Sequence, residues 1–136
     1  MKKAVTLVLF LALFSVAKNS YSTENVSQIT AEELNKMIED KADFILIDAR
    51  PEQMFKQEHI TGAISLPADK VDAQTLAKLS DNMEKKLVFY CADTHCPASR
   101  IAAAKAFGAG YKYVYEYLGG IAQWKEVGYK TAPQPK

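Results

Sequence analysis

Residues 87–91 read LVFYC, and residues 92–100 continue as ADTHCPASR. The first segment is rich in apolar and aromatic residues and predicts a buried strand that ends on Cys91. A short polar loop then leads to an Ala-rich helix that begins near Ala98. A thiol between a strand end and a helix N-terminus faces backbone N–H groups and the positive end of the helix dipole, and both favour the reactive thiolate. Cys91 is therefore the leading candidate for a catalytic nucleophile.

The rest of the chain predicts strands that alternate with helices. Thr30 and Glu33 have the spacing of a capping box at the start of a helix that runs to about Asp40. Strands are expected near residues 44–48, 63–66, 87–90 and 113–115, and further helices near 52–56, 72–79, 101–107 and 121–127. This alternation predicts a single α/β domain over residues 27–130, with a mostly parallel central sheet and helices on both faces. Residues 131–136 are expected to form a frayed tail.

The first residues have the composition of a secretory signal peptide. Lys2 and Lys3 supply a positive segment, and residues 4–17 form an apolar run that is too short to span a bilayer. Small residues suited to cleavage stand at 15–17 and 20–22. We expect residues 1–22 to be removed and the mature protein to be periplasmic or secreted, without stable membrane association. An uncleaved anchor is the alternative.

The bulk composition is that of one ordinary globular domain. Of the 136 residues, 49% are hydrophobic and 24% are charged, which excludes a disordered or fibrous chain. The 17 basic and 16 acidic residues nearly balance, and removal of the leader leaves a small acidic excess. This charge gives no support for a nucleic-acid partner.

Two polar segments follow predicted strands and are expected to meet at one edge of the sheet. They are residues 48–50, which read Asp-Ala-Arg, and the loop after Tyr90. The amides of a curled loop form a cradle for an anion. Asp48, Arg50 and His59 are interpreted as structural residues near the site, with hydrogen bonds and an ion pair. The alternatives are contact with an anionic substrate for the first two and general-base catalysis for His59.

Several motifs together resemble one known family. They are Leu46–Arg50, His59–Ile64, Tyr90–Cys91, and Leu118–Lys125 with Gly128. In this order and spacing they resemble the signatures of rhodanese-like domains, and the resemblance covers residues 27–130. It implies the rhodanese fold and sulfurtransferase chemistry.

The resemblance implies that Cys91 takes the outer sulfur of a small donor such as thiosulfate and holds it as a persulfide. Cyanide or a thiol, which can belong to a protein, then accepts that sulfur. No cofactor is implied. The implied substrate-binding residues are Ala92, Asp93, Thr94, His95, Cys96 and Arg100. Pro97 has no N–H group and cannot contribute to the cradle.

The loop departs from the family pattern because it is longer and carries a second thiol, Cys96. A phosphatase of the same fold is disfavoured because position 97, where it needs arginine, is proline. Two alternatives to a sulfurtransferase stay open: a dithiol redox or sulfide-releasing protein that uses Cys91 and Cys96, and a non-catalytic binding module. Cys91, His95 and Cys96 are soft ligands, but the chain lacks the two separated ligand pairs of strong zinc motifs, so no metal site is expected.

Overall fold

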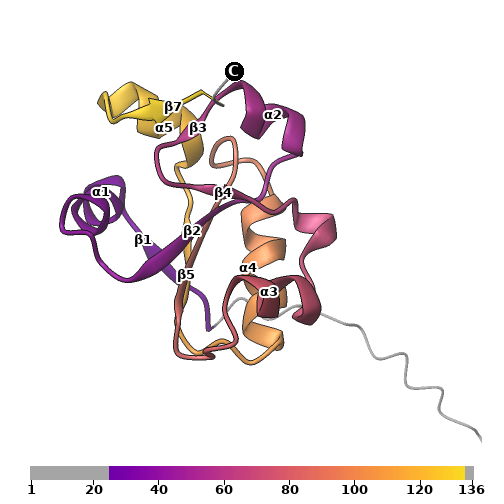
Figure 1. Ribbon diagram of the computed structural model, residues 1–136. Coiled ribbons are helices and arrows are strands. Elements are labelled where there is room, and N and C mark those ends of the chain that lie inside the picture. The colour runs from indigo at the N-terminus through magenta and orange to yellow at the C-terminus, as the bar shows by residue number, and fades with distance from the viewer. Residues whose placement is uncertain (1–24, 134–136) are drawn as a thin grey trace, which may run out of the picture.

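The central feature of the computed structural model is a five-stranded parallel sheet with the order β1-β6-β5-β2-β4. The structure describes residues 25–133, so the predicted leader and residues 134–136 lie outside it. The strands are β1 (Ser27–Ile29), β2 (Phe44–Asp48), β4 (Ile64–Ser65), β5 (Lys86–Tyr90) and β6 (Val114–Tyr117). The α/β architecture predicted from the sequence is confirmed (Figure 1).

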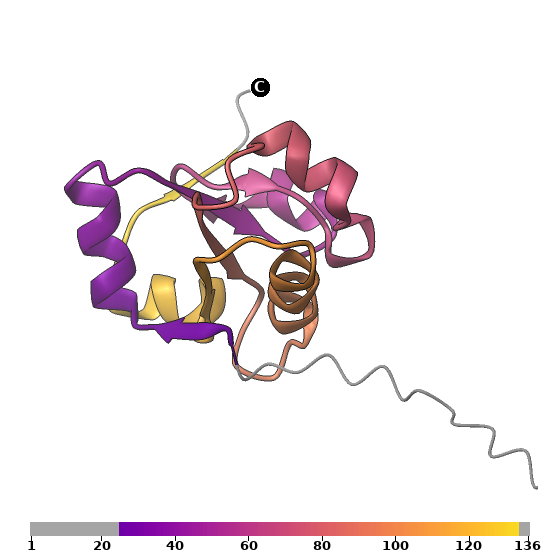
Figure 2. The same ribbon diagram turned by 90° about the horizontal axis from the view of Figure 1, so that it is seen from below.

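Helices cover both faces of this sheet (Figure 2). They are α1 (Ala31–Glu39), α2 (Glu52–Gln57), α3 (Ala73–Leu79), α4 (Ala98–Gly108) and α5 (Gly120–Val127), with a 3-10 turn η1 (Ala68–Lys70). Alternate residues of β5 enter two separate apolar clusters. Val88 and Tyr90 pack with residues of α1 and α5, whereas Leu87 and Phe89 pack with residues of α3 and α4. A strand covered on both faces explains the continuous apolar run in the sequence.

The first helix begins at the capping box that its sequence predicts. The Thr30 side chain accepts a hydrogen bond from the Glu33 amide at 3.2 Å, and the Glu33 carboxylate accepts one from the Thr30 amide at 2.8 Å. Asp72 caps α3 with the same reciprocal pattern through Thr75. Both helix starts are therefore fixed by local sequence.

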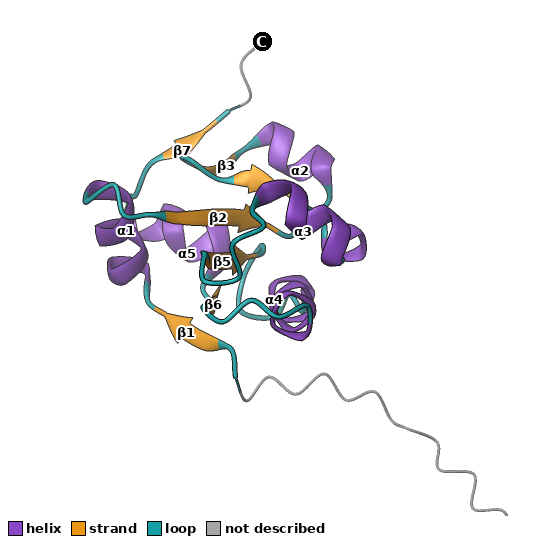
Figure 3. Cartoon of the chain, turned by 60° about the horizontal axis from the view of Figure 1, so that its bottom comes forward, coloured by secondary structure: helices purple, strands orange, loops and turns teal. Residues whose placement is uncertain are grey.

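The expected frayed tail is wrong at its first two residues. Thr131 and Ala132 form β7 (Thr131–Ala132), which pairs antiparallel with β3 (His59–Ile60) in a second, two-stranded sheet (Figure 3). Contacts on both sides hold this segment: the Trp124 indole N–H donates to the Lys130 carbonyl at 2.9 Å, and the Thr131 hydroxyl donates to the Glu58 carboxylate at 2.8 Å. Strands of two residues leave no periodic pattern in a sequence, so tertiary contacts alone place them.

No helix within residues 25–133 combines the length and apolar character needed to cross a membrane.

Candidate active site

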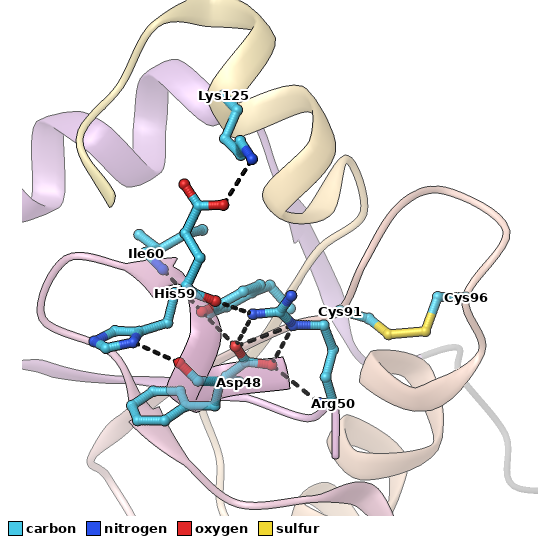
Figure 4. Close-up of polar contacts among 10 residues, drawn as sticks. Asp48, Arg50, His59, Ile60, Cys91, Cys96 and Lys125 are labelled. Atoms are coloured by element: carbon cyan, nitrogen blue, oxygen red, sulfur yellow. Dashed lines mark hydrogen bonds and ion pairs between the residues drawn. A yellow bond between two sulfur atoms is a disulfide. The ribbon is translucent and has the colours of Figure 1, made fainter. Parts of the chain in front are cut away.

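A buried ion pair lies at the carboxyl end of β2. Asp48 is fully buried, and its carboxylate accepts hydrogen bonds from the Arg50 backbone amide at 3.0 Å and from Arg50 Nη2 at 2.6 Å. The guanidinium also donates through Nη2 to the Glu58 carbonyl at 2.7 Å (Figure 4). Nε and Nη2 of Arg50 are thus both bonded to protein acceptors, and the pair ties the end of β2 to the chain beyond α2.

Tyr90, the last residue of β5, extends this network to the neighbouring strand. Its hydroxyl donates to Asp48 Oδ2 at 2.8 Å and accepts from the Ile60 amide at 3.0 Å. Burial, with the charge of Asp48, raises the pKa of the Tyr90 phenol far above its usual value, so the hydroxyl stays a donor. His59 is also buried, with Nδ1 2.9 Å from the Phe55 carbonyl and its ring stacked on Phe55. We call these contacts of Asp48, Arg50, Glu58, Ile60 and Tyr90 the β2 network.

Cys91 follows Tyr90 directly and therefore lies at the carboxyl edge of the central strand. Its side chain is 2% exposed. The Cys91 carbonyl accepts a hydrogen bond from the Ile121 amide at 3.1 Å, and the Ala92 carbonyl accepts one from the Ala122 amide at 3.0 Å. We call these two bonds the α5 contact, because both donors belong to the first turn of α5. They fix the backbone of the candidate nucleophile.

The α5 contact requires glycine at position 120. Gly120 has φ +62°, and a Cβ there would lie 2.6 Å from the Ala92 carbonyl carbon and 2.7 Å from the Asp93 amide nitrogen. Only a residue without a side chain allows the two backbones to approach this closely. Gly120 therefore serves the backbone geometry of the cysteine loop.

Cys91 and Cys96 form a disulfide across the loop of residues 91–97, with Cα atoms 6.1 Å apart (Figure 4). Asp93 organises the interior of this loop. Its carboxylate accepts from the His95 amide at 2.9 Å, and its carbonyl accepts from the Cys96 amide at 3.2 Å. Thr94 and the His95 side chain are exposed.

The loop amides that the sequence assigned to the substrate cradle fall into two groups. In this disulfide form, the amides of His95 and Cys96 are bonded to Asp93. Those of Ala92, Asp93 and Thr94 have no hydrogen-bond partner within residues 25–133. Helix α4 begins at Ala98, and the first amides of a helix have no intrahelical acceptor. Free N–H donors therefore lie between the two cysteines, at residues 92–94, and after Cys96, at the start of α4.

A buried carboxylate beneath the start of α4 is not predicted by the sequence. Glu116 on β6 is 3% exposed and accepts a hydrogen bond from Ser99 Oγ at 2.9 Å. Arg100, expected to contact substrate, has its Nε 3.8 Å from the other Glu116 oxygen and is half exposed. An isolated glutamate in a strand gives no sequence signal of this role, because its two partners lie on a distant helix.

An open hollow of about 470 Å³ adjoins the start of α4. Its wall includes Ala49 after β2, Lys70 of η1 and Ala98 of α4. The hollow lies at the carboxyl edge of the sheet, where parallel α/β folds bind small ligands. No group of three or more His, Cys, Asp or Glu side chains within residues 25–133 is placed to hold a metal ion.

This arrangement supports nucleophilic chemistry at sulfur. A cysteine is held at the end of a central strand by backbone bonds, and the N-terminal amides of an eleven-residue helix follow in the chain. Helix N-termini and free amides stabilise a thiolate or another anion. The second thiol, within bonding distance, adds the possibility of reversible oxidation.

A family model described as the rhodanese-like domain matches residues 30–127. The chain is 31% identical over 102 residues to the thiosulfate sulfurtransferase GlpE of Coxiella burnetii (strain RSA 331 / Henzerling II). The aligned region covers 75% of this chain and 87% of that protein. It is 29% identical over 103 residues to the adenylyltransferase and sulfurtransferase UBA4 of Candida albicans, covering 73% of this chain and 23% of that protein.

Solved structures show the same fold. The crystal structure of the BH2092 protein from Bacillus halodurans superposes with a TM-score of 0.73 at 28% identity, covering 79% of this chain and 77% of that chain. The solution structure of the rhodanese-like domain of the Alr3790 protein from Anabaena sp. gives a TM-score of 0.68 at 27% identity, covering 78% of each chain.

Proposed function

This chain belongs to the rhodanese-like domain family, and from that premise we propose that it is a sulfurtransferase that carries sulfane sulfur on Cys91. The observation that carries the proposal is the position of Cys91, directly after the central strand and ahead of the α4 N-terminus. The curated relatives described as sulfurtransferases support the reaction class.

The proposed reaction has two steps. The Cys91 thiolate attacks the outer sulfur of thiosulfate, the bond between the two sulfur atoms of the donor breaks, and sulfite leaves with the electron pair. The acceptor, a thiol or cyanide, then attacks the outer sulfur of the Cys91 persulfide and restores the thiolate. The free amides of Ala92, Asp93 and Thr94 and those at the start of α4 are the groups that would stabilise the negative charge on the persulfide.

Thiosulfate as donor is supported by the chemistry of the site. A doubly charged oxyanion needs N–H donors, and the amides of Ala92, Asp93 and Thr94, directly after Cys91, have no other partner within residues 25–133. In the β2 network, Nε and Nη2 of Arg50 are bonded to Asp48 and Glu58, so these two groups are not available to a ligand.

The test is thiocyanate formation from thiosulfate and cyanide by the reduced protein. We expect Cys91→Ser to lower the rate to that of the buffer, and Cys96→Ser to keep transfer to cyanide. Ile101→Ser, an exposed position on α4, serves as the surface control and should match the wild type. Equal rates for the wild type and Cys91→Ser would overturn the proposal.

We also propose that the protein acts after export. The basic residues Lys2 and Lys3 ahead of an apolar run support this location. Expression of the full chain in a Gram-negative host, followed by fractionation and N-terminal sequencing, is the test. A mature N-terminus near residue 23 in the periplasmic fraction is expected, and an intact Met1 in the cytoplasm would contradict export.

A further inference from the structure

The Cys91–Cys96 bond constrains only a short segment of the chain. It closes a loop of five residue steps, and the backbone at the start of this loop is already fixed by the α5 contact. In the chain-entropy account, the stabilisation by a disulfide grows with the logarithm of the length of chain that it closes, so a bridge this short lies at the low end of the range for disulfides. The 136-residue chain has no third cysteine. The pairing of the two thiols is therefore better explained by chemistry than by structure.

The two cysteine residues differ in their exposure to solvent. Cys91 is 2% exposed, whereas Cys96 is half-buried and lies between the exposed residues His95 and Pro97. In the disulfide form, Cys96 is therefore the more exposed of the two cysteines. Its Cα lies 6.1 Å from that of Cys91, inside the range of roughly 4.4–6.8 Å over which cysteines are bridged without backbone movement.

We propose that Cys96 resolves the Cys91 persulfide, an inference that rests on the sulfurtransferase function proposed above. The Cys96 sulfur attacks Cys91 Sγ and forms the Cys91–Cys96 bond. The bond between Cys91 Sγ and the outer sulfur of the persulfide anion breaks, and the outer sulfur leaves with the electron pair. It takes the Cys96 proton and is released as hydrosulfide. The two cysteines are oxidised by two electrons, and the sulfane sulfur is reduced to sulfide.

An external dithiol must then reduce the disulfide. The exposure of the two cysteines directs that attack to Cys96. Cys91 is then the leaving thiolate, next to the amides of Ala92, Asp93 and Thr94, which have no partner within residues 25–133, and a sulfur that is stable as a thiolate leaves faster. The complete cycle converts thiosulfate and a dithiol into sulfite, sulfide and a disulfide, and it returns the enzyme to its reduced form.

A single-turnover experiment without any added thiol tests this step. The full chain is reduced, freed of reductant and mixed with excess thiosulfate, and sulfite, sulfide and the intact protein mass are measured. For the wild type we expect one sulfide for each sulfite, and a protein lighter than the reduced form by two hydrogen atoms. For Cys96→Ser and Cys96→Ala we expect sulfite without sulfide, and a protein heavier by one sulfur atom. Ile101→Ser is the control and should behave as the wild type.

The outcomes separate the two proposals. Sulfite release without sulfide by the wild type, with the extra sulfur retained, overturns resolution by Cys96 and leaves the sulfurtransferase function standing. An extra sulfur that peptide mapping places on Cys96 shows relay of the persulfide and also overturns it. Absence of sulfite from both the wild type and Cys96→Ser overturns the sulfurtransferase function itself.

Discussion

The β2 network and the cysteine loop begin at paired positions, since Asp48 of β2 is in register with Tyr90 of β5, the residue before Cys91. Around Asp48, every partner is a buried or backbone group, and Arg50 donates to both Asp48 and Glu58. Around Cys91, the carbonyls are bonded to α5 while several amides stay free. Two loops at the same edge of the sheet thus differ. In one, the buried charges are bonded mainly to each other and to neighbouring backbone, and in the other, three backbone amides have no partner within residues 25–133.

This difference shows that the most strongly charged segment at this edge of the sheet is not the segment that carries the candidate nucleophile. In the charged segment, Asp48 and Arg50 form an ion pair with each other. The segment with an uncharged nucleophile has the available hydrogen-bond donors. Buried polar groups that are fully paired rigidify a fold, whereas unpaired donors near the surface are available to a substrate.

The largest expected effect is on stability and comes from Asp48→Ala. This change leaves the buried Arg50 guanidinium and the Tyr90 hydroxyl without their acceptor. We expect the free energy of unfolding to fall by about 3–5 kcal/mol, the usual result of an uncompensated buried charge. Urea denaturation measures it. Asp48→Asn, which keeps the shape and one acceptor oxygen, should lose less. A loss below about 1 kcal/mol for the alanine variant would contradict the structural role of the network.

Gly120→Ala should act on the loop more than on the whole fold. The left-handed backbone conformation alone costs about 1–3 kcal/mol with a side chain, and the new Cβ also meets Ala92. Gly128→Ala is the matched control, since Gly128 has φ +89° and a Cβ added there would have no atom within 4 Å. We expect both variants to lose stability, and Gly120→Ala alone to lose sulfur transfer. Equal activity of the two folded variants would contradict the α5 contact.

Glu58→Gln should change the response of stability to pH. Hydrogen bonds from Lys125 and Thr131 lower the pKa of the Glu58 carboxyl below 4.5. Its contribution is complete above the pKa of the unfolded chain and is lost as the pH falls through the lower folded value. We expect a contribution below about 1 kcal/mol, because the side chain is more than one third exposed. Denaturation at pH 7 and pH 3 should show a smaller acid loss in the variant; an unchanged difference would contradict it.

The smallest effect on stability is expected for Asp93→Ala, in the cysteine loop. The substitution removes the acceptor of the His95 amide at an exposed position, so the free energy of unfolding should change by no more than about 0.5 kcal/mol. Asp69→Ala, another exposed acidic position, is the control. A loss above about 1 kcal/mol would show that the loop, like the β2 network, supports the fold.

The sequence predicts the central architecture because its signals there are local. The apolar runs at residues 44–48 and 87–90 and the capping box at Thr30 need no knowledge of the rest of the chain. Strands β3 and β7 have two residues each and are held by contacts between distant parts of the chain, such as that of Thr131 with Glu58, so no local pattern predicts them. The expectation of a frayed tail failed for that reason.

The sequence likewise predicts one part of the candidate site and not the rest. The position of Cys91 follows from the order of strand, loop and helix. The pairing of Ser99 with Glu116 joins residues 17 positions apart and could not be inferred from either residue alone. The engagement of the His95 and Cys96 amides by Asp93 depends on the fold of the loop, which the sequence leaves open.

The α5 contact also bears on how the protein is made. Synthesis proceeds from the N-terminus, and the backbone around Cys91 is not fixed until Ile121 and Ala122 have been added. A nascent chain that ends at α4 or β6 therefore carries the cysteine without the bonds that position it. We expect the reactive loop to reach its final geometry only after α5 has been synthesised and has folded against it.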